Sequence, residues 1–326
     1  MEPAPLLVSF TSLPRALAAL PSEIVDRHRD EISQLVEKGY PPAVSIRCIA
    51  TLFGVSSDFI GALAHHPDNY YRSFTIKTGS KRRNINAPRV ALKVIQKWIG
   101  HHVSHSYTWP NAVMGFVPGR SAILGASVHC HARWVYTIDI RDFFQSTHAD
   151  TLVYPLSQLG YSAHAIEIIK SLCTYYGTLP QGAPSSPALS NLAFASADER
   201  LVEYAHASNI KYTRYADDLV FSGQDAIPKD IQDFVRGVIS SYGWQIAEEK
   251  ERLSKAPQRL KVYGLLVHGD APRLTKGYRN RLRAYSHLLK NNKIASKDVP
   301  KVLGHLAYAK SVDEFPVKQI QSLGYF

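Results

Sequence analysis

The sequence predicts an α+β fold, a small sheet with helices packed behind it, from three stretches of the chain. Residues 1–70 read as mostly helical, with apolar side chains at helical spacing in 43–53. Residues 134–139 are largely β-branched or aromatic, which is typical of a buried strand. Residues 212–222 form two strand-like runs around Ala216-Asp217-Asp218, which predicts a hairpin. A few strands among many helices indicate the α+β class.

Residues 49–56, within the N-terminal helical stretch, fit two interpretations. With Gly54 in the turn, they match a helix-turn-helix. The alternative is an ordinary helix pair that packs on the next domain. We favour the helix pair, because no base-reading side chains stand out on its second helix.

The remaining elements follow in chain order. Residues 71–77 alternate as a strand and 78–80 form a turn, and Pro88 precedes a helix at about 90–99. Asp142 is expected to cap or open the helix that follows the 134–139 strand. Further helices are predicted at about 149–175, at about 186–207 and from about 276 onward, with strands at about 259–268.

Composition narrows the class of protein. The 326 residues are enough for one large domain or for two to three subdomains, and 45% hydrophobic with 20% charged residues is typical of a soluble globular protein. No apolar run reaches the length of a membrane span, and the first residues lack the features of a secretory signal. The three cysteines are widely spaced and lack metal-ligand spacing, which indicates a reducing cytoplasmic compartment. We therefore expect a cytoplasmic protein that does not associate with a membrane.

The positive charge is concentrated in two places. The net charge is +11, and residues 252–301 hold thirteen Lys/Arg against two Asp/Glu, which equals the whole excess. Two clusters flanking a roughly neutral middle suggest the walls of a nucleic-acid channel, although solvated faces that keep the protein soluble are the alternative. The second cluster comprises Lys77, Lys81, Arg82, Arg83, Arg89, Lys93 and Lys97.

Adjacent carboxylates mark the predicted hairpin turn. Asp217 and Asp218 repel each other between two apolar strands, which costs stability unless a cation offsets the repulsion. A solvated turn that binds no metal is the alternative, but Asp139 ends a predicted core strand and supplies a third acid. Such a set can hold two Mg²⁺ ions about 4 Å apart, and its oxygen-only ligands suit Mg²⁺ or Mn²⁺ rather than zinc.

Four motifs in order resemble the blocks of reverse transcriptases. They are Asp139-x-x-Asp142-Phe143-Phe144, residues 179–187 (LPQGAPSSP), Tyr215-Ala216-Asp217-Asp218, and Gly243-Trp244-Gln245-Ile246-x-x-x-Lys250. The resemblance implies an RNA-directed DNA polymerase with a right-hand fold of fingers, palm and thumb and an antiparallel palm sheet. It also implies that Asp139, Asp217 and Asp218 are catalytic metal ligands, assisted by the Ile140 carbonyl.

The resemblance further implies which residues bind the incoming dNTP. Phe144 occupies the position that packs under the sugar and excludes a ribose 2′-hydroxyl; a core aromatic is the alternative. Gln181-Gly182 resembles the loop that touches nucleotide and template; a simple proline-rich loop before a helix is the alternative. Lys81 and Arg83 are favoured, within Lys81-Arg82-Arg83, for holding the triphosphate. Lys250 is expected near the leaving group, with an exposed helix lysine as the alternative.

The chain resembles retron reverse transcriptases over nearly its full length. This implies a helical N-terminal extension (1–69), fingers and palm (70–258) and a basic, RNA-binding thumb (259–326). Two retron signatures are altered. Asn-Ala-x-x-His becomes Gly125-Ala126-Ser127-Val128-His129, and Val-Thr-Gly becomes Val262-Tyr263-Gly264. The residues expected to bind RNA are His129, Arg259, Lys261, Arg279, Arg281 and Arg283.

The resemblance implies a structured non-coding RNA as template. Its copying is expected to start at a guanosine 2′-hydroxyl and to give branched RNA–DNA (msDNA), which serves antiphage defence with a separate effector protein. The alternatives are a group II intron-like or other cellular reverse transcriptase, a catalytically inactive RNA-binding protein, and a nucleotidyltransferase that acts without a template. Retention of the three aspartates argues against the inactive form.

Overall fold

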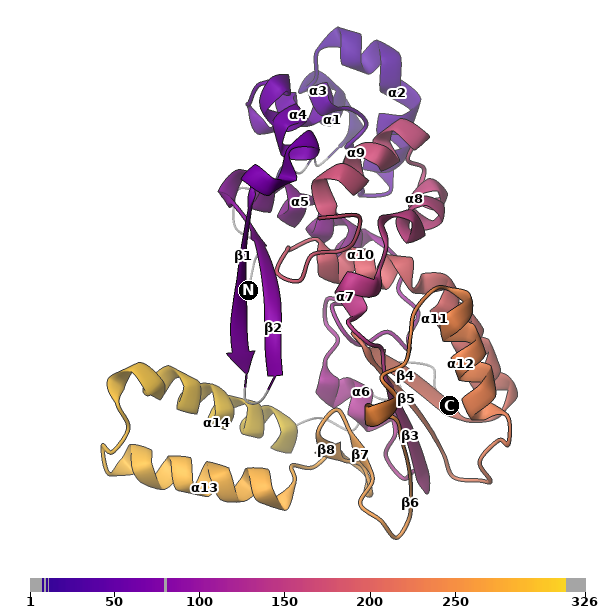
Figure 1. Cartoon of the computed structure of the whole chain (residues 1–326), viewed down its shortest axis with the longest axis vertical. Helices are drawn as coiled ribbons and strands as arrows, with labels where there is room; N and C mark the ends of the chain where they lie inside the picture. Colours follow the sequence, from indigo (N-terminus) through magenta and orange to yellow (C-terminus); the bar gives the residue numbers. More distant parts are fainter. Residues whose placement is uncertain (1–7, 9, 11, 79–80, 315–326) are drawn as a thin grey trace. The chain divides into compact units, whose positions relative to one another are not determined.

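The structure is a computed structural model that describes residues 8, 10, 12–78 and 81–314. The chain forms two compact units (Figure 1). The first comprises Met1–Trp109, Phe116–Pro118 and Asp142–Ser196; the second comprises Pro110–Gly115, Gly119–Arg141 and Ala197–Phe326. Both units therefore draw on the stretch 70–258, which the sequence assigns to fingers and palm.

The first unit is helical apart from one long hairpin. Strands β1 (Tyr71–Thr78) and β2 (Lys81–Pro88) pair antiparallel, from Tyr71 opposite Pro88 to Thr78 opposite Lys81. The predicted turn residues 79–80 lie outside the described part of the chain. The helices of this unit are α1 (Leu13–Ala18), α2 (Ser22–Glu37), α3 (Ile46–Phe53), α4 (Ser57–His65), η1 (Pro67–Asn69), α5 (Val90–Ser106), α7 (Phe143–Ser146), η2 (Ala149–Leu152), α8 (Val153–Leu159), α9 (Ala163–Cys173) and α10 (Ser186–Ala193).

The predicted helix pair at 49–56 is α3 and α4. Gly54 ends α3 in the left-handed region, with φ +66°, and the Ser56 hydroxyl accepts a hydrogen bond from the Phe59 amide at the start of α4. Among the described residues no single helix is long and apolar enough to cross a membrane; α3 and α4 meet that test only as a pair bent by 118°.

Two predicted long helices are interrupted. The stretch at about 186–207 divides at Phe194 into α10 and α11 (Ala195–Ala207). The stretch at about 149–175 divides at Gly160, whose φ of +111° ends α8, and Ser162 then caps α9 by accepting from the Ala165 amide. Asp142 stands at the N-cap position of α7 with φ +46°, but its side chain makes no capping hydrogen bond. Asp142 therefore opens the helix, one of its two predicted roles, but does not cap it through its side chain, because its backbone is left-handed rather than extended.

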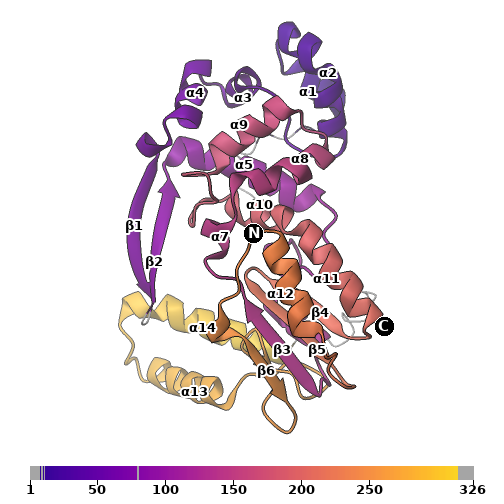
Figure 2. The same ribbon diagram turned by 45° about the vertical axis from the view of Figure 1, so that its right-hand side comes forward.

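The second unit is built on a four-stranded antiparallel sheet with the order β4-β5-β3-β6. Helices α11 and α12 lie on one face of this sheet (Figure 2). The strands are β3 (Trp134–Asp139), β4 (Lys211–Tyr215), β5 (Asp218–Gly223), β6 (Arg252–Lys255), β7 (Lys261–Val262) and β8 (Leu265–Leu266). The helices are α6 (Ala122–Val128), α11 (Ala195–Ala207, whose first two residues belong to the first unit), α12 (Ile231–Ser241), η3 (Glu248–Lys250), α13 (Lys276–Lys290), η4 (Ser296–Asp298) and α14 (Val299–Asp313).

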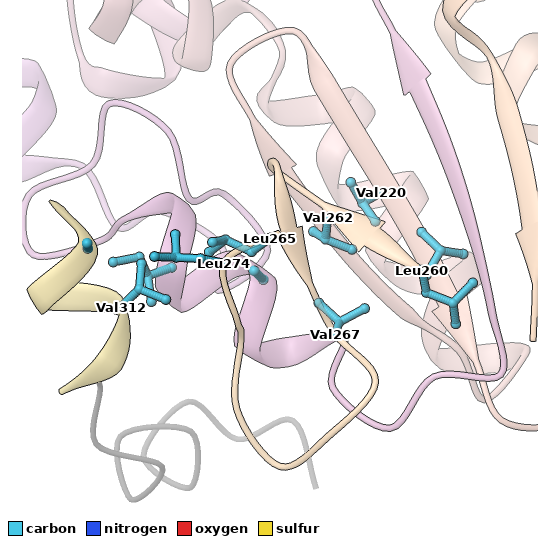
Figure 3. Packing of buried hydrophobic residues seen from close by; sticks show 11 residues of the cluster. Val220, Leu260, Val262, Leu265, Val267, Leu274 and Val312 are labelled. Carbon is cyan, nitrogen blue, oxygen red and sulfur yellow. The ribbon is translucent and has the colours of Figure 1, made fainter. Parts of the chain in front are cut away.

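A hydrophobic cluster connects the C-terminal part of this unit to the sheet. Val220 of β5, Val262 of β7 and Leu265 of β8 pack in it with Leu274 and with Val312 of α14 (Figure 3). All five side chains are buried, whereas α13 buries none of its residues fully. The helices and antiparallel strands together confirm the predicted α+β class.

Candidate active site

Three aspartates meet at one end of the four-stranded sheet. β3 ends at Asp139, which lies directly opposite Asp218, the first residue of β5. Asp217 lies in the two-residue turn between β4 and β5, and its carbonyl accepts a hydrogen bond from the Ile140 amide at 2.9 Å. Ala216, the other turn residue, has φ +56°. The predicted hairpin thus brings its carboxylates to the end of the predicted core strand.

The local field of this cluster disfavours a further negative charge. Loss of hydration within the surrounding protein raises the pKa of Asp218 to about 6, and the charges of Asp217 and Asp139 add to the effect. Lys250 acts in the opposite direction, and its ammonium forms an ion pair with Asp139. Asp139 itself is only 9% exposed. A cation therefore stabilises this end of the sheet.

The segment 243–250 positions Lys250. The Arg141 amide donates to the Gln245 carbonyl at 2.8 Å, and the Ala247 amide donates to the Asp139 carbonyl at 2.8 Å. Trp244 is buried and anchors the start of the segment. The segment 243–250 therefore runs alongside the residues at the end of β3, which brings Lys250 to Asp139. The predicted place of Lys250 near the leaving group stays a prediction.

The donors at this end of the sheet suit a divalent metal ion. The side-chain donors are carboxylate oxygens, the ligands that Mg²⁺ and Mn²⁺ prefer, and a cation would offset the repulsion from Asp217 and Asp139 that adds to the raised pKa of Asp218. Within the described residues, no group of three or more His, Cys, Asp or Glu side chains is already gathered closely enough to ligate an ion. The chemistry of the donors fits, and the ligand geometry stays a prediction for Asp139, Ile140, Asp217 and Asp218.

A buried ion pair supports the hairpin from the face of α11. Arg214 of β4 is fully buried, and its Nε donates to Asp198 Oδ1 at 2.9 Å while its Nη2 donates to Oδ2 at 2.5 Å. Arg214 Nη1 also donates to the Ala216 carbonyl at 3.1 Å, which fixes the turn between β4 and β5. The Tyr212 hydroxyl donates to Asp198 Oδ1 at 2.8 Å. Sequence reasoning missed this pair; the available signal was a charged residue inside an apolar strand.

Backbone packing restricts the turn on another side. A Cβ added to Gly115 would lie 2.5 Å from the Ala216 nitrogen, closer than any side chain tolerates. The Met114 amide donates to the Arg214 carbonyl at 2.7 Å, so this segment runs against β4. Gly115 is therefore required for the close approach of two backbones.

The predicted nucleotide-binding residues belong to the first unit, apart from Lys250. The Asn86 amide of β2 donates to the Gln181 carbonyl at 2.8 Å, and a Cβ added to Gly182 would lie 2.8 Å from Ile85 Cγ2. Gln145 Nε2 donates to Gln181 Oε1 at 3.2 Å, which joins the loop to α7 and hence to the neighbouring Phe144. These contacts bring β2, α7 and the 179–187 loop together.

The side chains of three predicted residues in this unit differ in environment. Phe144 is half-buried, with its ring 6.0 Å from the ring of Phe116. Arg83 is exposed on β2, and its contact with a triphosphate stays a prediction. Lys81 opens β2, but its side chain lies outside what the structure describes.

The placement of His129 differs from the predicted RNA contact. The residue is fully buried, with Nδ1 2.7 Å from Ser222 Oγ and Nε2 2.7 Å from Thr213 Oγ1. Burial lowers the pKa of His129 to about 3, with the charge of Lys211 acting in the same direction, so its ring is neutral at physiological pH. In this structure the imidazole offers no surface to RNA and instead joins the two strands of the hairpin.

The other predicted RNA-binding residues are exposed. Three of them lie on α13, whose Tyr278 hydroxyl is 2.8 Å from His305 Nδ1 of α14. α13 therefore uses its aromatic side to contact α14, while its arginines remain accessible to an anionic partner. The exposed residues are Arg259, Lys261, Arg279, Arg281 and Arg283.

Comparison with known proteins gives one consistent answer. The family model described as "Reverse transcriptase (RNA-dependent DNA polymerase)" matches residues 75–305. The Retron Ec86 reverse transcriptase of Escherichia coli is 30% identical over 280 residues, covering 84% of this chain and 87% of that protein. The Retron Mx65 reverse transcriptase of Myxococcus xanthus is 30% identical over 313 residues, covering 86% of this chain and 71% of that protein.

A solved structure of a foamy viral protease-reverse transcriptase in complex with RNA/DNA hybrid is 15% identical, with a TM-score of 0.43, and covers 78% of this chain and 30% of that chain. The segment matched by the family model contains both the aspartate cluster and the Gln181-Gly182 loop. The match to the family model agrees with the right-hand polymerase fold predicted from the sequence. The chain belongs to the reverse transcriptases, which are RNA-directed DNA polymerases, and within them to the retron reverse transcriptases.

Proposed function

We propose that this chain copies part of a dedicated structured non-coding RNA into single-stranded DNA, using divalent metal ions held by Asp139, Asp217 and Asp218. The observation that carries the proposal is the meeting of these carboxylates at the end of β3 and β5, where the pKa of Asp218 is raised to about 6. A site that disfavours its own negative charge is stabilised by cations. Mg²⁺ is the natural ion, two per site, and Mn²⁺ is the alternative.

The chain's own groups have distinct tasks in this site. Bound ions would lower the pKa of the attacking hydroxyl and offset the charge of the departing pyrophosphate. Asp139, Asp217 and Asp218 hold and orient the reacting groups, with the Ile140 carbonyl assisting. Lys250, which pairs with Asp139, supplies a positive charge beside the carboxylates and is available to the leaving phosphates.

The first unit supplies the nucleotide contacts. Arg83, with Lys81, binds the triphosphate, and Gln181-Gly182 contacts the incoming base pair. The loop is supported in this by the bond from the Asn86 amide to the Gln181 carbonyl. Phe144 packs under the sugar, where an aromatic ring excludes a ribose 2′-hydroxyl. The half-buried position of Phe144 leaves part of its ring accessible for that contact.

The RNA partner is the finer part of the proposal. The exposed arginines Arg279, Arg281 and Arg283 on α13, with Arg259 and Lys261, bind phosphates of the RNA. Synthesis starts from a guanosine 2′-hydroxyl and gives branched RNA–DNA, which acts in antiphage defence with a separate effector protein. Three cysteines without a disulfide, Cys48, Cys130 and Cys173, fit a reducing cytoplasm.

Nucleic acid that copurifies with the protein tests the proposal. It is sequenced before and after RNase and debranching treatment, from cells that express either wild type or the Asp217→Asn/Asp218→Asn variant. We expect a discrete DNA, joined at its 5′ end to a guanosine 2′ position, in the wild type only. A broad mixture of cellular RNA without linked DNA would instead favour a general reverse transcriptase.

A further inference from the structure

A chain of hydrogen bonds crosses the back of the catalytic hairpin, on the face opposite Asp198. His129, at the end of α6, bonds Ser222 of β5 and Thr213 of β4, each at 2.7 Å. All three residues are at most 2% exposed. Thr213 Oγ1 lies 2.7 Å from the hydroxyl oxygen of a fourth residue, Tyr263. Both strands of the hairpin are thus joined to the end of α6, and β4 is also joined to the turn that carries Tyr263.

The side chain of Tyr263 lies along β4, next to the catalytic turn. It lies between β7 and β8 with φ +48°, and its ring centroid is 5.6 Å from that of Tyr215. Thr213 and Tyr215 are two residues apart in β4 and therefore point to the same side of the strand. Tyr215 is followed directly by Ala216, Asp217 and Asp218. Tyr263 therefore contacts both Thr213 and Tyr215, which lie on the same side of β4 just before the catalytic acids.

The ring of Tyr263 occupies the space that a side chain at position 125 would need. Gly125 is buried within α6, and a Cβ added there would lie 2.7 Å from Tyr263 Cε2 and 3.0 Å from Met114 Cγ. Real Cβ atoms do not approach other atoms that closely. Positions 125 and 263 are also the two at which this chain departs from the retron signatures.

We infer that Gly125 and Tyr263 are structurally coupled: because Gly125 has no side chain, the ring of Tyr263 can pack beside it and hold the catalytic hairpin in place. Tyr263 is a positioning residue: it acts through Thr213 and Tyr215 on Asp217 and Asp218. The two signature departures are therefore a single structural exchange. The inference rests on the polymerase activity of the proposed function for its main readout.

A double-mutant cycle tests the coupling. Gly125→Ala, Tyr263→Thr and the double variant are compared by single-nucleotide incorporation and by thermal unfolding. In the wild-type background, Gly125→Ala forces the ring from its place, and we expect kcat to fall about tenfold. In the Tyr263→Thr background the ring is absent, and the same substitution should leave kcat unchanged within about twofold.

A hydroxyl deletion tests the positioning role separately. Tyr263→Phe keeps the ring and removes one hydrogen bond to Thr213, so we expect kcat to fall about fivefold. KM for the dNTP should change less than about twofold, because most residues proposed to bind the nucleotide belong to the first unit. The matched control is Tyr204→Phe on α11, which removes a hydroxyl that donates to Asp230, the residue before α12, at 3.0 Å; we expect its kcat to equal that of the wild type.

The outcomes separate the possible errors. Equal effects of Gly125→Ala on kcat and Tm in both backgrounds would overturn the coupling. If the kcat of the Tyr263→Phe variant equals that of the Tyr204→Phe variant, the positioning role of Tyr263 is overturned. A wild-type protein that extends no primer would refute the proposed function instead, and the cycle in Tm would still decide whether positions 125 and 263 are coupled.

Discussion

Replacing Asp198 by Asn should show how strongly the β4–β5 hairpin depends on its buried ion pair. The substitution keeps the shape of the side chain and removes its charge, which leaves the fully buried guanidinium of Arg214 uncompensated. Breaking a buried pair by neutralising one partner costs about 3–5 kcal/mol. At about 2–4 °C per kcal/mol, Tm should fall on the order of 10 °C. The Ala216 carbonyl, which Arg214 also binds, should lose its restraint, so polymerase activity should fall as well.

Thermal unfolding followed by circular dichroism measures this effect. The matched control is Asp150→Asn, which removes the same charge from a pair with Lys170 in which the Asp150 side chain is 89% exposed. Solvent screens that pair, so we expect Tm to change by less than about 2 °C. If Asp198→Asn lowers Tm no more than Asp150→Asn does, the buried pair is not what supports the hairpin.

Three further predictions concern the site itself. Phe144→Val should raise rNTP incorporation relative to dNTP by at least about tenfold in primer extension, and unchanged sugar discrimination would refute its role as the sugar gate. Gly182→Ala should lower single-nucleotide incorporation, because φ is +123° and the added methyl lies 2.8 Å from Ile85 Cγ2; wild-type rates would contradict the close packing of loop and β2. The folded-state pKa of Asp218 is about 6, above its ordinary 3.8, so folding favours its protonated form. In the presence of EDTA, the contribution of protonated Asp218 to stability is fully present below pH 3.8 and is lost as the pH rises through about 6. The Asp218→Asn variant should not show this loss of Tm. Identical curves of Tm against pH for the wild type and the variant would refute the pKa shift.

The strands that carry the site were predictable because their residues determine them locally. The run Trp134–Asp139 is almost entirely buried, as its β-branched and aromatic composition predicts, and β4–β5 turns at the expected acids. β6 and α12 were not predicted. β6 (Arg252–Lys255) is short, charged and mostly exposed, because it pairs along only one edge with β3, so it lacks an apolar pattern.

The meeting of Asp139 with Asp217 and Asp218 was predictable, but the groups that hold these residues in place were not. Asp198 and Arg214 come together from α11 and β4, and His129 meets Ser222 from 93 residues away. Such partnerships depend on packing between distant elements, for which a single sequence carries little signal. For the same reason the sequence revealed the unusual residues Gly125 and Tyr263 but not their contact.

Primer extension on an RNA template with Mg²⁺ tests most directly whether the aspartate cluster carries out polymerisation. The wild type and the Asp217→Asn/Asp218→Asn variant are compared at matched folded fraction, with Tyr204→Phe as a control outside the site. The account predicts template-dependent DNA synthesis by the wild type and the control, and none by the double variant. Synthesis by the double variant at the wild-type rate, or none by the wild type with any divalent metal, would contradict it.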